Sequence, residues 1–288
     1  MVTYVRDQTG RFQQRPHYKP EELDRECESV ITGFLKGLYG EARYPVDTED
    51  LKKLIERDAE DLDVYADLSN YGPDVEGVTE FKPGRKPAVK IASVLTEDER
   101  RENRLRTTLT HEWGHVHFHA YLWEVEPPPP DLLRQQPNRD KIICKRDSML
   151  DAAQTDWMEW QAGYVCGAIL MPKNAVLTLC RRFAEDHGIF GAVSLQAAAG
   201  TDLISQVVSA FKVSADAARV RLEAGRVAVP PGLRPDPRLV RHRHRHLRRV
   251  HGDPVPHLRG DARRGPVPGG VPRLLRRLGR AHRRQPRG

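Results

Sequence analysis

The chain has 288 residues, of which 39% are hydrophobic, so it can form one large domain or two small ones. No apolar run approaches the roughly 20 residues of a membrane-spanning helix. The polar N-terminal sequence also lacks the apolar stretch of a signal peptide. We therefore expect a soluble, cytoplasmic protein whose four scattered cysteines are free thiols.

The net charge of +7 hides an uneven distribution. Residues 226–288 contain 18 Arg, three Asp and neither Lys nor Glu, which gives this end of the chain +15 and leaves −8 for the rest. Its composition cannot bury enough apolar surface to offset the entropy of chain ordering. We therefore predict a disordered tail over residues 227–288.

This Arg-rich tail admits three interpretations. It can bind nucleic acid, remain merely solvated, or result from out-of-frame translation of a GC-rich gene, because Lys and Glu are absent beside so much Arg. The alternating histidines at 241–246 can also bind metal adventitiously. The acidic remainder of the chain gives no general reason to expect nucleic-acid binding.

The first half of the chain predicts helices and one hairpin. Residues 1–19 are expected to form a flexible leader. Apolar residues at three- and four-residue spacings predict a helix over 20–39, and a shorter helix is expected over 47–57. Two strands over 77–81 and 88–93, joined by a turn-rich Lys-Pro-Gly-Arg segment, predict an antiparallel hairpin.

The second half is predicted to be mostly helical. Thr96 and Glu99 form a capping-box pattern that opens a long helix over 97–121. A proline run then begins a loop-like insert that ends near residue 155. A further helix over 156–171 stops at Pro172, and two or three shorter helices fill 173–225.

The long helix over 97–121 contains the sequence H-E-x-x-H. Its two histidines, His111 and His115, lie four residues apart and therefore point from the same face of the helix. They can offer two imidazole nitrogens to one tetrahedral zinc ion at about 2.0–2.1 Å each. Glu112 is displaced by one helical step, where it can act as the base for a water molecule whose pKa the zinc lowers. The alternative is an amphipathic helix with two surface histidines.

A zinc peptidase needs a third protein ligand, and Glu159 on the helix over 156–171 is the candidate. The small residues Ala162, Gly163 and Cys166 lie on nearly the same face as Glu159. They would allow this helix to approach the H-E-x-x-H helix closely enough for one carboxylate to reach the metal. The alternative is a solvated glutamate at a helix start.

These two segments together resemble the ImmA/IrrE family of bacterial metallopeptidases. The resemblance rests on TLTHEWGHVHFH at 108–119, EWQAGYVCGAILMP at 159–172 and the segment Phe211–Leu222, and it covers about residues 20–225. It implies a zinc site at His111, His115 and Glu159. The chain departs from the family pattern in its proline-rich insert and in Gly163, where the family often has Asn.

His119 and the segment Phe211–Leu222 each have more than one possible role. His119 can orient a ligand, stabilise an oxyanion or bind the metal itself, and we favour a position behind the ligands. The segment Phe211–Leu222 resembles a helix-turn-helix, but the scarcity of basic residues on its second helix favours packing or partner docking over DNA reading.

We expect an α+β fold, mostly helical, with four parts. A flexible leader is followed by a zincin-like metallopeptidase domain over 20–172 with a small antiparallel sheet, a small helical region over 173–226 and the disordered tail. An extended peptide is expected to add as a strand along 88–93.

The resemblance implies a zinc-dependent endopeptidase, with Glu112 as the catalytic base. It also implies regulatory proteolysis of a helix-turn-helix repressor from a mobile element or a stress response. The alternatives are a metal-containing binding module or DNA-associated regulator without efficient hydrolysis, and a nucleic-acid binder that acts through its tail. Manganese and iron remain alternatives to zinc.

Overall fold

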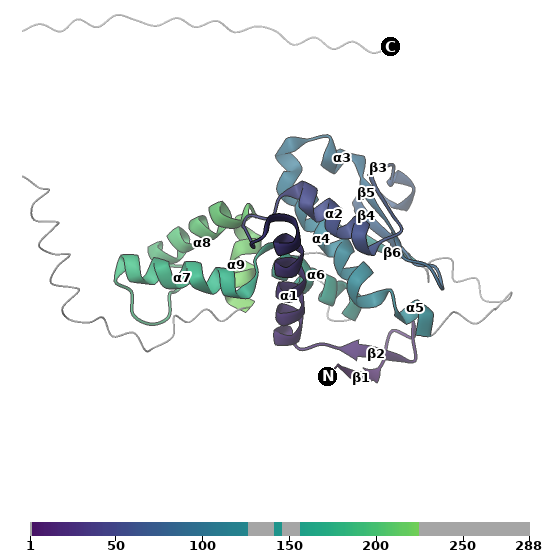
Figure 1. Cartoon of the computed structure of the whole chain (residues 1–288), viewed down its shortest axis with the longest axis horizontal. Coiled ribbons are helices and arrows are strands. Elements are labelled where there is room, and N and C mark those ends of the chain that lie inside the picture. Colours follow the sequence, from purple (N-terminus) through teal and green to yellow (C-terminus); the bar gives the residue numbers. More distant parts are fainter. Residues whose placement is uncertain (1, 126–140, 146–155, 225–288) are drawn as a thin grey trace, which may run out of the picture. The chain divides into compact units, whose positions relative to one another are not determined.

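The computed structural model describes residues 2–125, 141–145 and 156–224 (Figure 1). The tail predicted over 227–288 and most of the insert predicted after the proline run lie outside these residues. Within them the chain folds as α+β, as expected.

A hairpin replaces the flexible leader predicted over 1–19. Strands β1 (Thr3–Arg6) and β2 (Gln14–His17) pair antiparallel. The carboxylate of Asp7 accepts hydrogen bonds from the backbone N–H groups of Thr9 and Phe12, at 2.9 and 3.0 Å, and so shapes the turn. The buried side chain of Phe12 anchors the hairpin to the rest of the protein. The short, polar N-terminal sequence does not predict this contact.

The first two helices lie where the spacing predicts them. Helix α1 (Pro20–Tyr39) begins at a first-turn proline, and the left-handed Gly40 (φ 79°) follows its last residue. Helix α2 (Thr48–Asp58) has an acidic first turn, which favours the positive end of the helix dipole.

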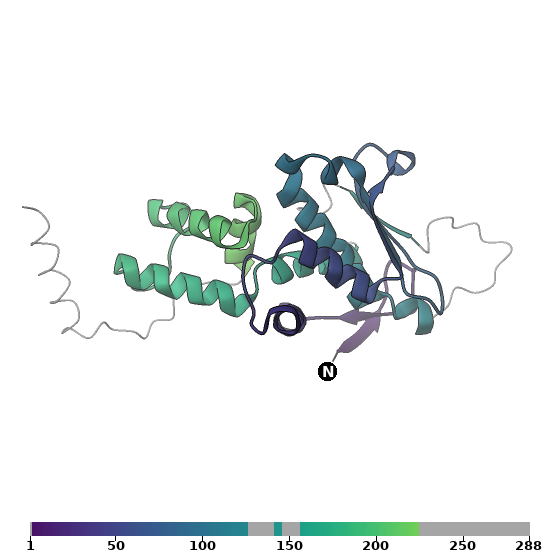
Figure 2. The same ribbon diagram turned by 45° about the horizontal axis from the view of Figure 1, so that its top comes forward.

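The sheet has four strands in the order β3-β5-β4-β6, and Figures 1 and 2 show α2 and α4 on one face of it. The predicted hairpin is confirmed as β4 (Val75–Glu80) antiparallel to β5 (Ala88–Ala92). Strand β3 (Asp61–Ala66) runs parallel to β5, so this four-stranded sheet is mixed, whereas the two-stranded β1–β2 sheet is antiparallel; the expected small antiparallel sheet is thus found in part. Two of the six residues of β3 are Asp, which is depleted in strands, so the sequence does not predict this strand.

The other edge of this sheet is β6 (Lys141–Lys145), which pairs antiparallel with β4. It lies inside the stretch predicted as a loop-like insert, so that prediction is wrong for these five residues. Because β5 has a neighbour on each side, the expected addition of a peptide along 88–93 is also excluded.

The capping box predicted at Thr96 and Glu99 does not form. Thr96 ends the short helix α3 (Ser93–Thr96), and its hydroxyl donates instead to the carbonyl oxygen of Val64 at 2.7 Å. One 3₁₀ turn (Glu99–Arg101) comes next, and α4 runs over Glu102–His119. The H-E-x-x-H motif therefore lies in the last three turns of a buried helix.

The remaining elements complete the described chain. A 3₁₀ turn (Ser69–Tyr71) precedes β4, and the short helix α5 (Leu122–Val125) follows α4. Helix α6 ends just before Pro172, as predicted. The helices after the sheet are α6 (Trp157–Leu170), α7 (Lys173–His187), α8 (Ala198–Phe211) and α9 (Ala215–Ala224).

Buried charges connect the C-terminal helices to the earlier ones. The guanidinium of Arg106 in α4 donates to the carbonyl oxygens of Val46, Phe211 and Lys212. Arg221 in α9 forms a 2.7 Å ion pair with Asp24 in α1. One buried apolar cluster includes side chains from both sides of Pro172, so the two predicted regions share a core.

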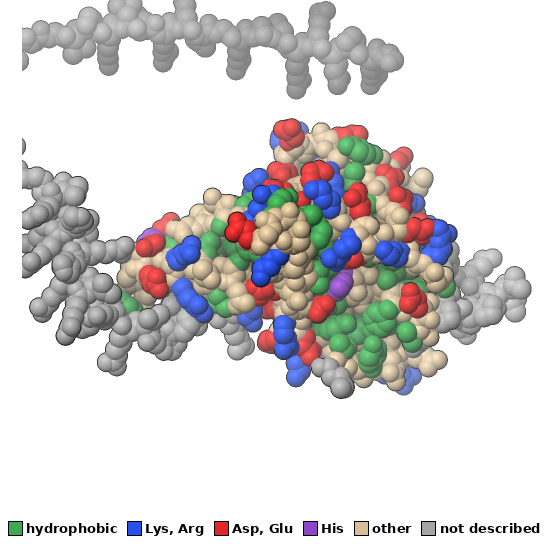
Figure 3. Space-filling view, in the orientation of Figure 1, with side chains coloured by type: hydrophobic (Ala, Val, Ile, Leu, Met, Phe, Trp, Pro, Cys, Tyr) green, Lys and Arg blue, Asp and Glu red, His purple; other side chains and the backbone are tan. Residues whose placement is uncertain are grey.

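In the described segments no single helix is both long and apolar enough to cross a membrane. Helices α6 and α7 taken together are long and apolar enough, but the chain bends by 55° where they join. On the face drawn in Figure 3, acidic and basic side chains are interspersed.

Candidate metal centre

Helix α4 presents His111 and His115 from one face, as their spacing predicts. Both side chains are completely buried, and their Nε2 atoms lie 3.1 Å apart. Two imidazole nitrogens that face each other so closely share one hydrogen or one cation, because two lone pairs at this distance repel.

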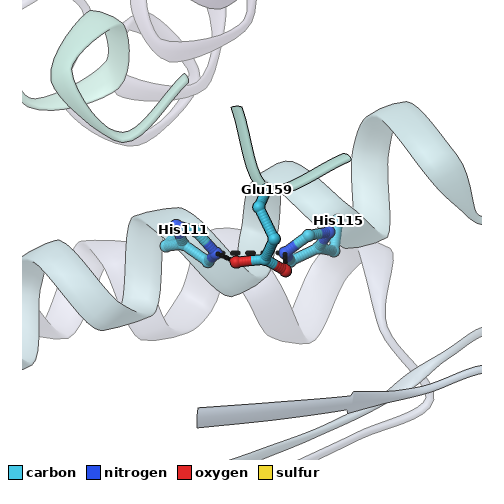
Figure 4. A group of neighbouring side chains, drawn as sticks. All are labelled: His111, His115 and Glu159. Atoms are coloured by element: carbon cyan, nitrogen blue, oxygen red, sulfur yellow. Dashed lines mark hydrogen bonds and ion pairs between the residues drawn. The ribbon is translucent and has the colours of Figure 1, made fainter. Parts of the chain in front are cut away.

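Helix α6 delivers Glu159 to the same point. Its two carboxylate oxygens lie 3.3 Å from the Nε2 atoms of His111 and His115, one oxygen to each ring. Figure 4 shows the carboxylate between the two rings, reaching them from the second helix. The structure therefore brings together the three residues that the sequence predicts as ligands.

The separations between these atoms suit a metal ion. Ligands bound tetrahedrally at about 2.0–2.1 Å are about 3.3–3.4 Å apart. The two Nε2 atoms are 3.1 Å apart, each lies 3.3 Å from a different oxygen of Glu159, and one ligand atom from each residue lies within 4.8 Å of the other two. His111, His115 and Glu159 can thus hold one metal ion while leaving a coordination position for another ligand.

The close approach of α4 and α6 depends on Gly114. A Cβ atom at this position would lie 3.2 Å from the Cα atom of Ala162 and 3.1 Å from a methyl group of Val165. Ala162 is fully buried in this contact, whereas Gly163 is partly exposed. The predicted role of small residues on α6 is confirmed for Ala162, and the matching glycine on α4 was not identified from the sequence.

Glu112 lies between α4 and strand β4, and it is fully buried. The hydroxyl of Thr79 donates a 2.5 Å hydrogen bond to its Oε2 atom. Its Oε1 atom has no hydrogen-bond partner in the described part of the chain. Burial raises the pKa of this carboxyl group above its ordinary value, although the two nearby histidines oppose the shift.

His119 is behind His115 and is not one of the three converging ligands. The Nδ1 atoms of the two rings are 3.1 Å apart, and Nε2 of His119 lies 3.0 Å from Oε1 of Gln161. Burial and the neighbouring His115 lower the pKa of His119 well below its ordinary value, so this ring is neutral. These contacts agree with the position behind the ligands that we predicted for His119.

Gln161 determines which atom donates and which accepts in each of these hydrogen bonds. This residue was not predicted from the sequence. Its side-chain N–H donates to the carbonyl oxygen of Pro16 in β2 at 3.0 Å, so its oxygen faces His119. His119 then donates from Nε2 to Gln161 and accepts at Nδ1 from His115. This arrangement places the hydrogen of His115 on Nδ1 and leaves the Nε2 lone pair directed at the ligand cluster.

Opposite charges stabilise the centre before any metal binds. Burial alone would raise the pKa of Glu159, but the neighbouring imidazoles of His111 and His115 hold it well below its ordinary value. Burial alone would lower the pKa of His111, but Glu159 outweighs it and the net shift is upward.

Comparison with known proteins adds no assignment. No family model matches the chain, and no curated protein matches it.

Proposed function

We propose that the chain is a zincin-like, zinc-dependent endopeptidase. One observation carries the proposal: His111, His115 and Glu159 converge, and a buried carboxylate with one unpaired oxygen, Glu112, lies beside them. Structural zinc sites have four protein ligands, whereas catalytic sites have three and a neighbouring base.

The chemistry assigned to the metal follows from the donor set. Two imidazole nitrogens and one carboxylate suit zinc, and manganese or iron are the alternatives that metal analysis separates. A zinc ion bound there would polarise a carbonyl group and lower the pKa of a water molecule toward about 7.

Glu112 is the residue that moves the proton. Thr79 holds the Oε2 atom, so Oε1 remains available to accept a proton from an attacking water molecule. The raised pKa of Glu112 brings it closer to neutral pH, where it can also return that proton to the leaving amine. His119 and Gln161 orient His115 and touch no substrate in this proposal.

The substrate class is supported by the motifs, which resemble those of peptidases that cut helix-turn-helix repressors. We therefore propose a bacterial helix-turn-helix repressor, from a mobile element or a stress response, as the substrate. A metal-containing binding module or DNA-associated regulator is the second candidate, since complete burial of His111, Glu112 and His115 also suits a metal site without turnover.

Metal stoichiometry of the full chain tests the centre. Purified protein without an affinity tag is loaded with zinc, manganese or iron, dialysed and analysed beside Glu159→Ala and Glu21→Ala. Glu21 is an exposed carboxylate, so its variant controls for metal bound at the surface or by the histidines of the tail. We expect Glu159→Ala to bind one zinc per chain less than the wild type, and Glu21→Ala to bind as much zinc as the wild type. Equal metal in all three proteins would contradict the site.

Cleavage of a repressor encoded beside the gene tests catalysis. Glu112→Gln should retain zinc and lose cleavage by about 10²- to 10⁴-fold, because the amide cannot accept the proton. Full cleavage by this variant would exclude Glu112 as the base. Normal zinc content without cleavage in the wild type would favour the binding module.

A further inference from the structure

Strand β6 pairs with the edge of β4 opposite β5, and Glu112 lies over one face of β4. The two β4 residues that contact this side chain are Gly77 and Thr79. Their partners across the strand pair are Cys144 and Ile142, respectively. The main chain of β6 therefore passes directly beside the residues that position the proposed catalytic base.

Ile142 also packs in an apolar cluster near the candidate metal centre, and the space that its side chain takes is called the Ile142 pocket below. Its side chain is 5% exposed and packs within one buried cluster. The other members of this cluster are Phe12, Phe81, Leu122, Trp123, Trp157 and Met158. The pocket adjoins the ligand cluster, because Trp157 and Met158 directly precede Glu159 and the Trp157 ring lies edge-on to His119 at 5.4 Å.

Strand β6 is held by five register pairs with β4, by the contacts of Lys141 with Tyr71 and Glu80, and by the packing of Ile142 and Ile143. It pairs with the sheet along one edge only, and the sheet order ends with it in the described part of the chain. Lys141 forms a 3.0 Å ion pair with Glu80, but it is 36% exposed and shares the same carboxylate oxygen with Lys90. Exposed ion pairs contribute about 0–1 kcal/mol, and Ile142 is the most buried of the described β6 side chains.

A peptide that binds by strand addition needs a free strand edge and a pocket for alternate side chains. Here β4 supplies that edge beside Glu112, and the Ile142 pocket supplies the side-chain site. Both are filled by the chain itself.

We propose that residues 141–145 form an internal pseudosubstrate strand. An extended peptide with an aliphatic side chain at the pocket position replaces β6 on β4, and this replacement brings the peptide backbone to the metal centre. The inference rests on the proposed peptidase function for its biological meaning, but strand replacement itself is measurable as binding.

A reversible clamp tests whether β6 must leave β4. Glu80 and Lys141 lie opposite each other, so Glu80→Cys with Lys141→Cys, in a Cys144→Ser background, allows a disulfide to join the strands. A matched clamp, Arg6→Cys with Gln14→Cys, joins the opposed positions of β1 and β2. Disulfide formation is verified by mass spectrometry, and each reduced protein is its own control for folding.

The probe is a fluorescent peptide with the sequence of residues 141–145, serine replacing the cysteine, and binding is followed by anisotropy with zinc-loaded protein. We expect binding to be lost in the oxidised Glu80–Lys141 clamp, restored by reductant, and unaffected by the β1–β2 clamp. Equal binding to the oxidised and reduced forms would overturn the proposal, because β6 would then be a permanent strand whose outer edge binds the peptide.

Ile142→Ala supplies a second measurement that needs no disulfide. Removing this buried side chain should tighten peptide binding by roughly tenfold or more, since the intrachain competitor is weakened. A peptide with alanine in place of Ile142 should bind more weakly than one with alanine in place of Ile143, which is on the opposite face. Unchanged affinity for Ile142→Ala would also overturn the proposal.

These measurements are independent of hydrolysis. Specific peptide binding without cleavage would support the pseudosubstrate and contradict the peptidase. If the oxidised and reduced forms of the Glu80–Lys141 clamp cleave a repressor at equal rates, the peptidase function is supported and the pseudosubstrate strand is contradicted.

Discussion

Gly77 in β4 leaves the space that the Glu112 side chain occupies. A Cβ atom at position 77 would lie 2.8 Å from Cδ of Glu112 and 3.0 Å from its Cγ atom, which are closer than ordinary non-bonded contacts. The sheet therefore determines where the proposed base is placed, although that base belongs to a helix.

Gly77→Ala should displace the Glu112 carboxylate without touching the metal ligands. We expect cleavage to fall by about 10²-fold, because a misplacement on the order of 1 Å has that effect on positioned groups. Zinc content should stay at the wild-type level, and both quantities are measured on the same preparation. A normal cleavage rate in this variant would show that Glu112 does not act from its observed position.

Gly114→Ala should act on the metal centre through the spacing of α4 and α6. The added methyl group meets the backbone of Ala162 and the side chain of Val165 at 3.1–3.3 Å, so these neighbours on α6 must shift by a few tenths of an ångström. We expect a loss of about 1–3 kcal/mol in the free energy of unfolding and weaker zinc binding, because Glu159 moves with α6. Denaturant titration and zinc competition assays measure the two effects.

Gly33→Ala is the matched control for this variant. Gly33 is also in a helix, and a Cβ atom there meets nothing within 4 Å. Stability should be unchanged or rise by up to about 1 kcal/mol. If both alanine variants behave alike, helix spacing at Gly114 does not determine zinc affinity.

Gln161→Leu tests the hydrogen-bond chain behind His115. The substitution keeps the side-chain size but leaves His119 without its acceptor and Pro16 without its donor. We expect zinc affinity to fall by roughly 10- to 100-fold, as found for residues that orient a metal-binding histidine. Unchanged affinity, measured by chelator competition, would show that His115 is held by other contacts.

The metal-free protein should lose stability in mild acid because of His119. Its pKa in the folded protein is below the ordinary 6.5, so below pH 6.5 the unfolded chain binds a proton that the folded chain does not. The free energy of unfolding should therefore fall by up to about 1.4 kcal/mol per pH unit below 6.5 from this group.

His119→Gln removes this contribution and serves as the comparison. The raised pKa of His111 contributes stability below pH 6.5, which is opposite in sense to the contribution of His119. Because His111 is present in both proteins, it does not account for a difference between them. Urea unfolding between pH 7.5 and 5.5 should show the steeper loss in the wild type. Parallel curves would mean that His119 does not stay neutral in the fold.

The ligand set was predictable because its spacing is local. Residues four apart on a helix share a face whatever surrounds the helix, so His111 and His115 follow from the sequence. Glu159 required one further step, a chemical need for a third ligand on a helix with small neighbours. The N-terminal hairpin could not be predicted, because it depends on the distant contact of Asp7 with the indole N–H of Trp157 at 3.1 Å.

By itself, the sequence determined the helices, the β4–β5 hairpin and the three candidate ligands, all of which follow from periodicity and residue chemistry over short distances. Only the tertiary structure decided the surroundings of those ligands. Gly77 and Thr79 contact Glu112 across 35 and 33 residues of chain, and Gln161 reaches Pro16 across 145. Such contacts arise from the packing of whole elements, for which local patterns carry no information.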